Sequence, residues 1–190
     1  MLFMVFTIGL LGIGLWLSLL LNEAPSDTSG PKRLGKTTVL AIGCSTSLFE
    51  EVTKAMENRG ANVSYLEDVP DFTEGIDEGV VVMFDGDWLE ENLENYTFHD
   101  FLRKCVSERS KLTTVGGRTS LFFEALDKAE VNKLYRDENG NSRNPAYFDP
   151  PLVGFKIVET TTPEGPNVYP SILISNTNNV DTMIQALFDW

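Results

Sequence analysis

The sequence predicts an α/β domain of three layers, with a mostly parallel sheet between helices on both faces, preceded by one N-terminal transmembrane helix. Short apolar runs rich in β-branched residues alternate with longer segments of helical periodicity, a pattern typical of βαβ units. Two of these runs, "TTVLAIG" and "GVVVMFDG", have a continuous apolar stretch, as strands buried on both faces do. The first 21 residues carry no charged side chain.

The N-terminal run "MLFMVFTIGLLGIGLWLSLLL" is long enough to cross the hydrocarbon core of a bilayer as a helix. A secretory signal peptide is the alternative, but it would have a basic start, a shorter apolar region and a small-residue cleavage site. No lysine or arginine precedes this run, and Asn22-Glu23-Ala24 is a poor cleavage site. We therefore expect a retained anchor over 1–22, with the lipid bilayer as its partner, then a flexible tether over 23–36 and one domain over 37–190.

The orientation of the anchor has two opposing indications. Lys32, Arg33 and Lys36 follow the apolar run, and the positive-inside rule then favours a cytoplasmic domain. An anchor followed by a polar tether is also the usual layout of exported domains, and the sequons at Asn62 and Asn95 are compatible with that location. We expect the domain outside the cytoplasm, where Asn62 and Asn95 would be glycosylation sites.

Composition excludes several classes of partner. The chain has 15 Lys and Arg against 28 Asp and Glu, a net charge of −13, so nucleic acid is not an expected partner. The two cysteines, Cys44 and Cys105, form no C-x-x-C or Cys/His spacing, and we predict two free thiols. We predict neither a metal nor a cofactor, while a protein partner remains open.

The elements follow from local periodicity, β-branched content and turn residues. We predict strands at 37–43, 62–68, 79–86, 111–117, 153–160 and 171–175. We predict helices at 47–59, 88–110, 120–135 and 179–190, with Ser47 capping the first and Cys105 on the apolar face of the second. The last two strands are expected to form an antiparallel edge, joined through "TTPEGPNVYP", and a loop rich in Asn and Pro is expected over 136–151.

One motif match is misleading. "GPKRLGKT", residues 30–37, fits the phosphate-binding pattern G-x-x-x-x-G-K-[ST]. A working loop of this kind needs a strand before the glycines and a helix after Lys-Thr, because the helix N-terminus binds the phosphates. Here the match follows the tether, and Lys36-Thr37 lead into a strand. We therefore exclude a nucleotide site at this position.

Ligands of open α/β sheets bind beyond the carboxyl ends of the strands, and three segments fall there. The first is Cys44, Ser45, Thr46 and Ser47, after the first strand. These residues suit an activated thiol or an anion site, or else the hydroxyls cap the following helix and Cys44 packs. No arginine follows the turn, so a cysteine phosphatase loop is excluded.

The second segment is "FDGDW", in which Asp85 and Asp87 end a buried strand. Paired carboxylates can hold Mg²⁺ or Ca²⁺. Phosphatases with a D-x-D motif normally have it after the first strand, with a threonine soon after, and those features are missing here. The interpretation we prefer is that Asp87 caps a helix beginning at Trp88.

The third segment is Gly116, Gly117 and Arg118, a glycine turn between a strand and a helix, as in a nucleophile elbow. With the order of elements over about 37–130, it resembles the class I glutamine amidotransferase-like superfamily, which implies a flavodoxin-like fold. Catalytic members carry Cys in G-x-C-x-G at this turn and His further on, whereas Gly117 and Arg118 stand here and His99 precedes the turn. No catalytic residue is carried over, and the turn becomes a candidate anion site with Arg118 as counter-charge.

These observations lead to a preferred function and two alternatives. We prefer a membrane-anchored, non-catalytic domain that binds a small ligand or a protein partner at the strand ends. The first alternative is a hydrolase or transferase using Cys44, Asp85, Asp87 and Arg118, which requires these residues to converge on one pocket. A dyad of His99 with a cysteine is a further catalytic option.

The second alternative is a structural or assembly subunit. It would dock on a partner through the C-terminal helix, "IQALFDW", or through the aromatic segment "PAYFDPP". This alternative requires an exposed apolar patch around Phe188 and Trp190, or around Tyr147 and Phe148.

Overall fold

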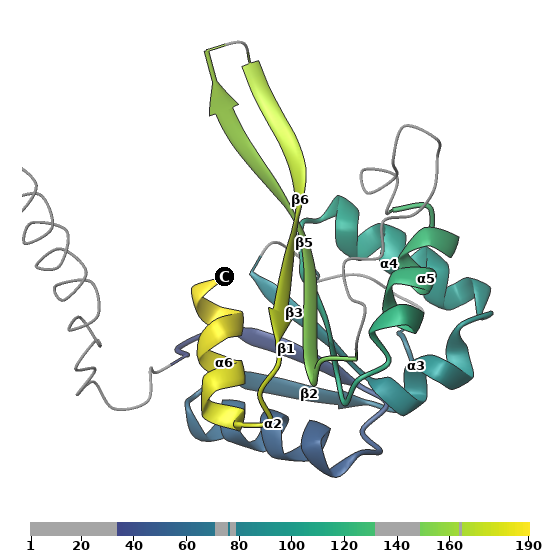
Figure 1. Cartoon of the computed structure of the whole chain (residues 1–190), viewed down its shortest axis with the longest axis vertical. Coiled ribbons are helices and arrows are strands. Elements are labelled where there is room, and N and C mark those ends of the chain that lie inside the picture. The colour runs from purple at the N-terminus through teal and green to yellow at the C-terminus, as the bar shows by residue number, and fades with distance from the viewer. Residues whose placement is uncertain (1–33, 71–75, 77–78, 132–148, 164) are drawn as a thin grey trace, which may run out of the picture. The chain divides into compact units, whose positions relative to one another are not determined.

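The structure is a computed structural model that describes residues 34–70, 76, 79–131, 149–163 and 165–190. It has an α/β fold (Figure 1). Within the described residues six strands form one sheet in the order β2-β1-β3-β4-β5-β6. The first four strands are parallel, while β5 pairs antiparallel with β4 and with β6. The predictions of a mostly parallel sheet and of an antiparallel edge are therefore confirmed.

Every predicted strand is present, with shifted ends. The strands are β1 (Thr38–Ile42), β2 (Asn62–Leu66), β3 (Val80–Asp85), β4 (Lys111–Val115), β5 (Leu152–Thr162) and β6 (Gly165–Ser175). The helices are α2 (Ser47–Asn58), α3 (Gly86–Asn92), α4 (Tyr96–Ser107), α5 (Thr119–Lys128) and α6 (Val180–Asp189).

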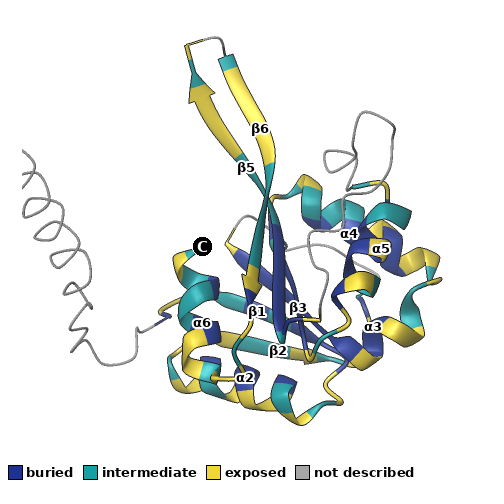
Figure 2. Cartoon of the chain, in the orientation of Figure 1, coloured by how far each residue is buried: buried dark blue, intermediate teal, exposed yellow. Residues whose placement is uncertain are grey.

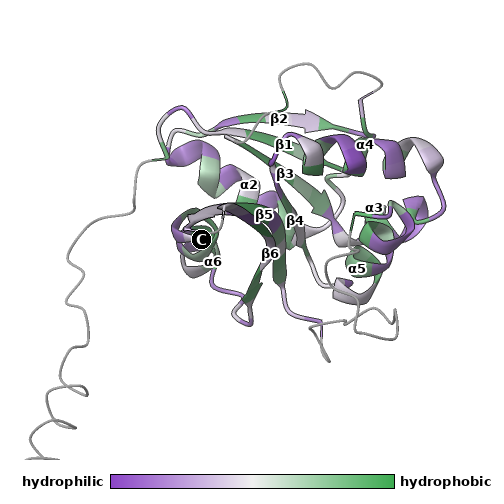
Figure 3. Ribbon diagram, turned by 90° about the horizontal axis from the view of Figure 1, so that it is seen from above, coloured by the Kyte–Doolittle hydropathy of each residue, from purple (hydrophilic) through white to green (hydrophobic). Residues whose placement is uncertain are grey.

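The sheet has helices on both faces because its central strands are apolar on both faces. In β3 all six residues are buried; Val82 and Phe84 pack with α3, α4 and α5, whereas Val81 and Met83 pack with α2 and α6 (Figure 2). Viewed from above, apolar strands lie between these two groups of helices (Figure 3). Each face of the sheet thus has its own apolar core.

The membrane anchor lies outside the described residues. In the described part of the chain no helix is both long enough and apolar enough to span a bilayer. Residues 1–22 and the tether up to residue 33 are not described, so the anchor and its orientation stay predictions.

The turn before β1 excludes the phosphate-binding loop on structural grounds as well. Both the backbone N–H and the hydroxyl of Thr37 donate to the carbonyl oxygen of Leu34, at 3.3 and 2.7 Å. Thr37 is followed directly by β1 and not by a helix. Lys36 and Thr37 therefore have no helix N-terminus to present to a phosphate.

The prediction of one continuous helix over 88–110 was wrong, because two helices occupy that segment. The chain breaks after α3, and Asn95 starts α4 by accepting hydrogen bonds from the backbone N–H groups of Thr97 and Phe98. An asparagine competes with the helical backbone and favours a cap, a signal that the continuous apolar periodicity concealed. The helix predicted over 120–135 ends earlier, at Lys128, and residues 132–135 lie outside the described residues.

Strands β5 and β6 are longer than predicted, with 11 residues each. β4 pairs with Leu152–Phe155, and beyond that point β5 has β6 as its partner. We call the part made of Lys156–Thr162 and Gly165–Ser171 the arm; it extends past the end of β4, and none of its residues is buried (Figures 1 and 2). The segment predicted as a connection, "TTPEGPNVYP", is therefore mostly strand.

The C-terminal helix packs on its own sheet. Met183, Ile184 and Leu187 of α6 are fully buried. Trp190 closes over β5 and β6: its indole N–H donates to the Ser171 hydroxyl at 2.7 Å, and a Cβ on Gly154 would lie 2.8 Å from its ring. The apolar side of α6 is therefore occupied within the domain.

Candidate functional site

The three predicted segments meet at the carboxyl edge of the parallel strands. The strand order switches between β1 and β3, the kind of position at which open sheets bind ligands. Asp85, the last residue of β3, lies in register with Val115 of β4. A Cβ on Gly86 would lie 3.3 Å from the carbonyl oxygens of Gly116 and Gly117. The end of β3 and the glycine turn are thus in direct contact.

Asp85 is a bracing residue of this edge. It is fully buried, and its Oδ2 accepts hydrogen bonds from Ser45 N, Thr46 N and Thr46 Oγ1 at 3.0, 2.7 and 2.9 Å. Its Oδ1 accepts a fourth from Asp87 N at 3.0 Å. A buried carboxylate is tolerated when its oxygens are satisfied in this way. Asp85 joins the loop after β1 to the start of α3 and has little accepting capacity left for a ligand.

The cap of α3 differs from the prediction. Asp87 was expected to cap a helix beginning at Trp88, but α3 begins at Gly86 and its N-cap is Asp85. The strand leads into the helix with no intervening loop, so the last strand residue supplies the capping carboxylate. Asp87 lies in the first turn, exposed to solvent, where a negative charge is favourable.

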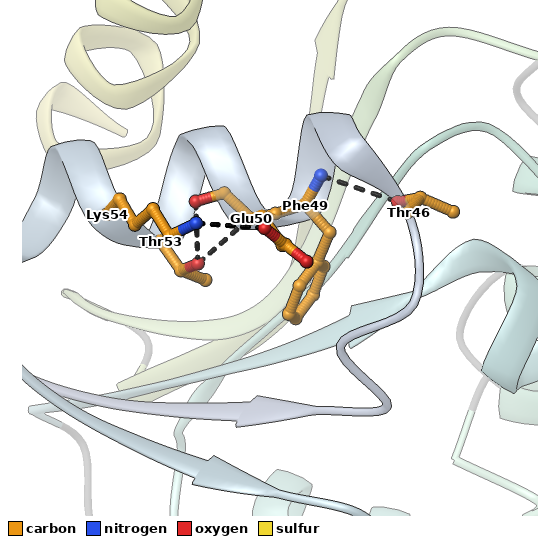
Figure 4. A network of polar contacts seen from close by, with 5 residues as sticks. All are labelled: Thr46, Phe49, Glu50, Thr53 and Lys54. Carbon is orange, nitrogen blue, oxygen red and sulfur yellow. Dashed lines mark hydrogen bonds and ion pairs between the residues drawn. The ribbon is translucent and has the colours of Figure 1, made fainter.

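The side chain of Thr46 connects Asp85 to the first turn of α2. Its hydroxyl donates to Asp85 and accepts from the Phe49 backbone N–H at 3.4 Å, which makes Thr46 the N-cap in place of the predicted Ser47. Figure 4 follows the contact along the helix to Thr53, whose hydroxyl donates to the Phe49 carbonyl oxygen at 2.9 Å. The start of α2 is therefore fixed to the end of β3 through one side chain.

Gly43 fixes the first turn after β1. Its φ is +76°, and a Cβ at this position would lie 2.1 Å from Cβ of Trp88. A side chain here would meet both a left-handed backbone and the buried Trp88 of α3. No local pattern indicates this contact, because it joins the end of β1 to a residue 45 positions later in the chain.

The glycine turn has three consecutive residues with positive φ. They are Gly116 at +96°, Gly117 at +89° and Arg118 at +63°. Arg118 occupies the N-cap position of α5, yet its side chain makes no capping hydrogen bond. Asp149 supplies the acceptor instead, its Oδ1 lying 3.0 Å from Thr119 N. The predicted order of strand, glycine turn and helix is confirmed, while Asp149 was not predicted.

Arg118 already has carboxylate partners. Its Nη2 lies 2.7 Å from Glu90 Oε2 and 3.7 Å from Asp87 Oδ1, both on α3. All three side chains are about half exposed, so the pairs add little to stability. They do neutralise the guanidinium, which was expected to serve as the counter-charge for a bound anion.

The surroundings of both cysteines raise the pKa of the thiol. Cys44 is exposed, and partial burial, followed by the charges of Glu50 and Asp85, raises the pKa of its thiol. Cys105 is fully buried in α4, and burial raises the pKa of its thiol from 9.0 to about 12. A raised pKa lowers the thiolate fraction at neutral pH, the opposite of what a nucleophile needs.

His99 is committed to the packing of α4. It is 8% exposed, and its Nε2 lies 2.8 Å from the carbonyl oxygen of Leu93. Among the described hydrogen bonds none joins the imidazole to a cysteine. The Cys–His dyad therefore has no support in this geometry.

A polar hollow of about 570 Å³ lies over the carboxyl edge. Its lining consists of Thr46, Ser47, Leu48, Asp87, Gly116, Gly117, Arg118, Asp149, Pro151 and Asn178. This volume falls within the usual range of small-molecule sites. No described residue accepts a hydrogen bond from the backbone N–H of Ser47, Leu48, Gly117 or Arg118. The hollow thus combines free donors from two helix N-termini with the carboxylates of Asp87 and Asp149.

The predicted candidates divide between two hollows. Thr46, Ser47, the glycine turn and Arg118 line the larger one, whereas Cys44 and Ser45 line a second, of about 370 Å³, with Glu67 and Glu91. Asp87 lines both, and Asp85 is buried beneath them. Asp149 and Asn178 enter the larger hollow from loops late in the chain, and no pattern in the sequence marked them.

The two sequons have different surroundings. Asn62 begins β2 and is exposed, whereas Asn95 is half-buried at the start of α4, where its carbonyl oxygen caps the helix. The side-chain nitrogen of Asn95 lies 3.4 Å from Asn92 Oδ1. Asn62 is therefore the more accessible acceptor if the domain lies outside the cytoplasm.

Among the described residues no group of three or more His, Cys, Asp and Glu side chains is arranged to hold a metal ion. Searches of family models, curated proteins and solved structures found no match to this chain.

Proposed function

We propose that this chain is a non-catalytic binding domain of flavodoxin-like type, tethered to a membrane by residues 1–22 on the side away from the cytoplasm. Its ligand is a small polar molecule without net negative charge, bound in the larger hollow between the N-termini of α2 and α5. On this proposal the chain is a member of the glutamine amidotransferase-like superfamily that lacks the catalytic residues.

One observation carries the proposal: the groups that could do chemistry at this edge are already engaged, while the hollow beside them has free donors. Asp85 accepts four hydrogen bonds, and Arg118 is paired with Glu90. The thiol of Cys44 has a raised pKa. A general base or nucleophile needs a free lone pair and a pKa suited to its task.

The charged side chains that line the larger hollow favour a neutral or zwitterionic ligand. Asp87 and Asp149 both border the hollow, so a phosphate or a second carboxylate would face two like charges there. The free backbone donors and the amide of Asn178 suit hydroxyl, carbonyl or amide groups of a neutral or zwitterionic ligand. Arg118 would not favour an anion strongly, because Glu90 already neutralises it.

The hydrolase or transferase alternative requires Cys44, Asp85, Asp87 and Arg118 to converge on one pocket, and they do not. Cys44 lines the smaller hollow and Arg118 the larger one. Asp85 is buried beneath both and accepts four hydrogen bonds, so it is not free to act on a substrate. The assembly alternative through α6 is weakened because α6 packs on its own sheet, and Tyr147 and Phe148 lie outside the described residues.

The test uses the full chain in detergent micelles and amide NMR. The probes are small neutral sugars, zwitterionic amino acids and, as an anionic comparison, inorganic phosphate. We expect a neutral or zwitterionic probe to shift the amides of Ser47 and Gly117 and to bind more weakly to Asn178→Ala. Asn167→Ala, which removes an exposed amide from the arm, is the matched control and should bind like the original chain.

Two outcomes would overturn the proposal. One is tighter binding of phosphate than of any neutral probe at these amides. The other is chemical conversion of a probe that is lost in Cys44→Ala but retained in Asn167→Ala, since that would make the edge catalytic.

A further inference from the structure

We infer that the side chain of Trp190 locks the direction of the arm, and that opening this lock lets the arm swing about its base between Gly154 and Lys156. The lock joins the end of α6 to the place where β5 and β6 leave the sheet (Figure 1). It is a conformational device of the fold, because the position of α6 then controls the direction of the arm. The inference does not depend on the proposed ligand site.

The backbone of the arm is not paired with the rest of the sheet. β4 pairs with Leu152–Phe155, and from Lys156 onward β6 is the strand with which β5 pairs. None of the residues of the arm is buried. A two-stranded ribbon is marginally stable in water and twists more strongly than a wide sheet. Side chains at the base must therefore fix the direction in which the arm points.

The ring of Trp190 contacts both strands at this base. Lys156 of β5 lies opposite Ser171 of β6, so the two side chains share one face of the ribbon. The indole N–H of Trp190 donates to the Ser171 hydroxyl at 2.7 Å, and the ammonium of Lys156 lies 4.7 Å from the centroid of the ring. Lys156 also donates to the backbone oxygen of Trp190. A single residue thus holds the first residue of the arm on β5 and the last one on β6.

Gly154 makes room for the ring. A Cβ at this position would lie 2.8 Å from Cζ3 of Trp190 and 3.3 Å from Cβ of Leu173. A glycine within a strand weakens the strand and often marks a close approach by another group. The indole therefore lies directly on the backbone of β5, just before the arm begins.

Trp190 is itself fixed to the body of the domain. It follows α6, whose side chains Met183, Ile184 and Leu187 are fully buried. Lys111, the first residue of β4, donates to the carbonyl oxygen of Leu187 at 3.2 Å, and its ammonium lies 5.6 Å from the centroid of the Trp190 ring. The lock thus passes the positions of α6 and β4 to the arm.

The opposite face of the base has different contacts. Ile157 and Ile172 pack against the core on that face, and both are partly buried. Arg109 forms an ion pair with Glu159, but the two side chains are 46% and 33% exposed, and such pairs contribute little to stability. Without Trp190 the base would be held from this face alone.

The lock can open while the domain stays folded. Trp190 is half-buried, and its polar partners, Ser171 and Lys156, can bond to water when the ring leaves them. The buried side chains of α6 lie in the preceding turns and need not move with the ring. The structure shows the locked state, and rotation of the ring away from Gly154 gives the free one.

The test measures the direction of the arm by double electron–electron resonance on the full chain in detergent micelles. In a Cys44→Ser background, nitroxide labels at Asn58→Cys on α2 and Asn167→Cys on the arm report the distance from the domain body to the arm. Both asparagines are exposed, whereas the remaining cysteine, Cys105, is buried and stays unlabelled. We expect a narrow distribution of distances in this chain, and one about twofold wider or more after Trp190→Ala.

Two further variants separate the lock from a general effect of α6. Phe188→Ala is the matched control, because Phe188 lies at the same end of α6 and its ring faces Lys111, at 5.9 Å, and not the arm. It should leave the distribution narrow. Trp190→Phe keeps a ring over Lys156 but loses the N–H bond to Ser171, so it should widen the distribution less than Trp190→Ala does.

A second pair of labels reports on the rest of the domain. Asn58→Cys with Ser107→Cys on α4 lies wholly outside the arm, and its distribution should stay narrow in Trp190→Ala. Widening of both pairs would show that Trp190 supports the whole fold, which overturns the inference. An arm distribution that Trp190→Ala leaves unchanged, or that Phe188→Ala widens as much, overturns it too.

Discussion

The parallel half of the sheet and the arm use the same kind of strand in opposite ways. In the parallel half, every residue of β3 is buried, and its last residue, Asp85, fixes the loops after two strands. In the arm, β5 and β6 have each other as strand partners, and residues 159–161 and 166–169 are exposed. Buried contacts are therefore concentrated around the carboxyl edge, whereas the arm has exposed surface that is available for contacts.

A large effect is expected from removing the brace. Asp85→Ala would leave the N–H groups of Ser45, Thr46 and Asp87 without their acceptor in a buried site. We expect a loss of about 2–3 kcal/mol in the free energy of unfolding, measured by urea denaturation of the full chain. Asp87→Asn is the control, since Asp87 is exposed, and it should change stability by less than about 0.5 kcal/mol. Equal effects would contradict the role given to Asp85.

Gly43→Ala tests the contact between β1 and α3. The new methyl group would meet Trp88 at 2.1 Å, and the backbone would keep a φ of +76°. Gly60→Ala has a similar backbone cost, with φ at +92°, but nothing lies within 4 Å of its Cβ. We expect Gly60→Ala to cost about 1 kcal/mol and Gly43→Ala about 3 kcal/mol or more. A difference near zero would mean that Trp88 moves away freely.

The stability of the fold at alkaline pH tests the burial of the Cys105 thiol. Burial raises the pKa of Cys105 from 9.0 to about 12, so the folded chain keeps this proton to higher pH than the unfolded chain does. The contribution is fully present below pH 9 and is lost as the pH rises toward 12, by about 1.4 kcal/mol per unit in that window. The Cys105→Ala variant should lose stability less steeply above pH 9. Identical slopes would show that the buried thiol is not the titrating group.

Much of the fold could be predicted because β1 and β3 are continuously apolar and lie between helices of regular periodicity. The length of the arm could not. Its Thr, Pro and Gly residues are typical of turns, and they are tolerated in a strand here because one edge and one face of the ribbon are free.

The location of the candidate site could be predicted from the sequence, but the roles of its residues could not. The strand ends could be found because architecture alone places ligand sites there. The roles of the residues could not, because they depend on contacts between distant segments. Asp85 bonds to residues about 40 positions earlier, and Asp149 caps a helix 30 positions before it. No local pattern marks such pairs.

The most direct test of the contrast between the two regions is hydrogen–deuterium exchange of the full chain. We predict that the amides of β1, β3 and the inner part of β5, Leu152–Phe155, exchange slowest, through global unfolding. The amides of the arm should exchange faster by orders of magnitude, through local opening of the ribbon. Arm amides as protected as those of β3 under these conditions would contradict the account.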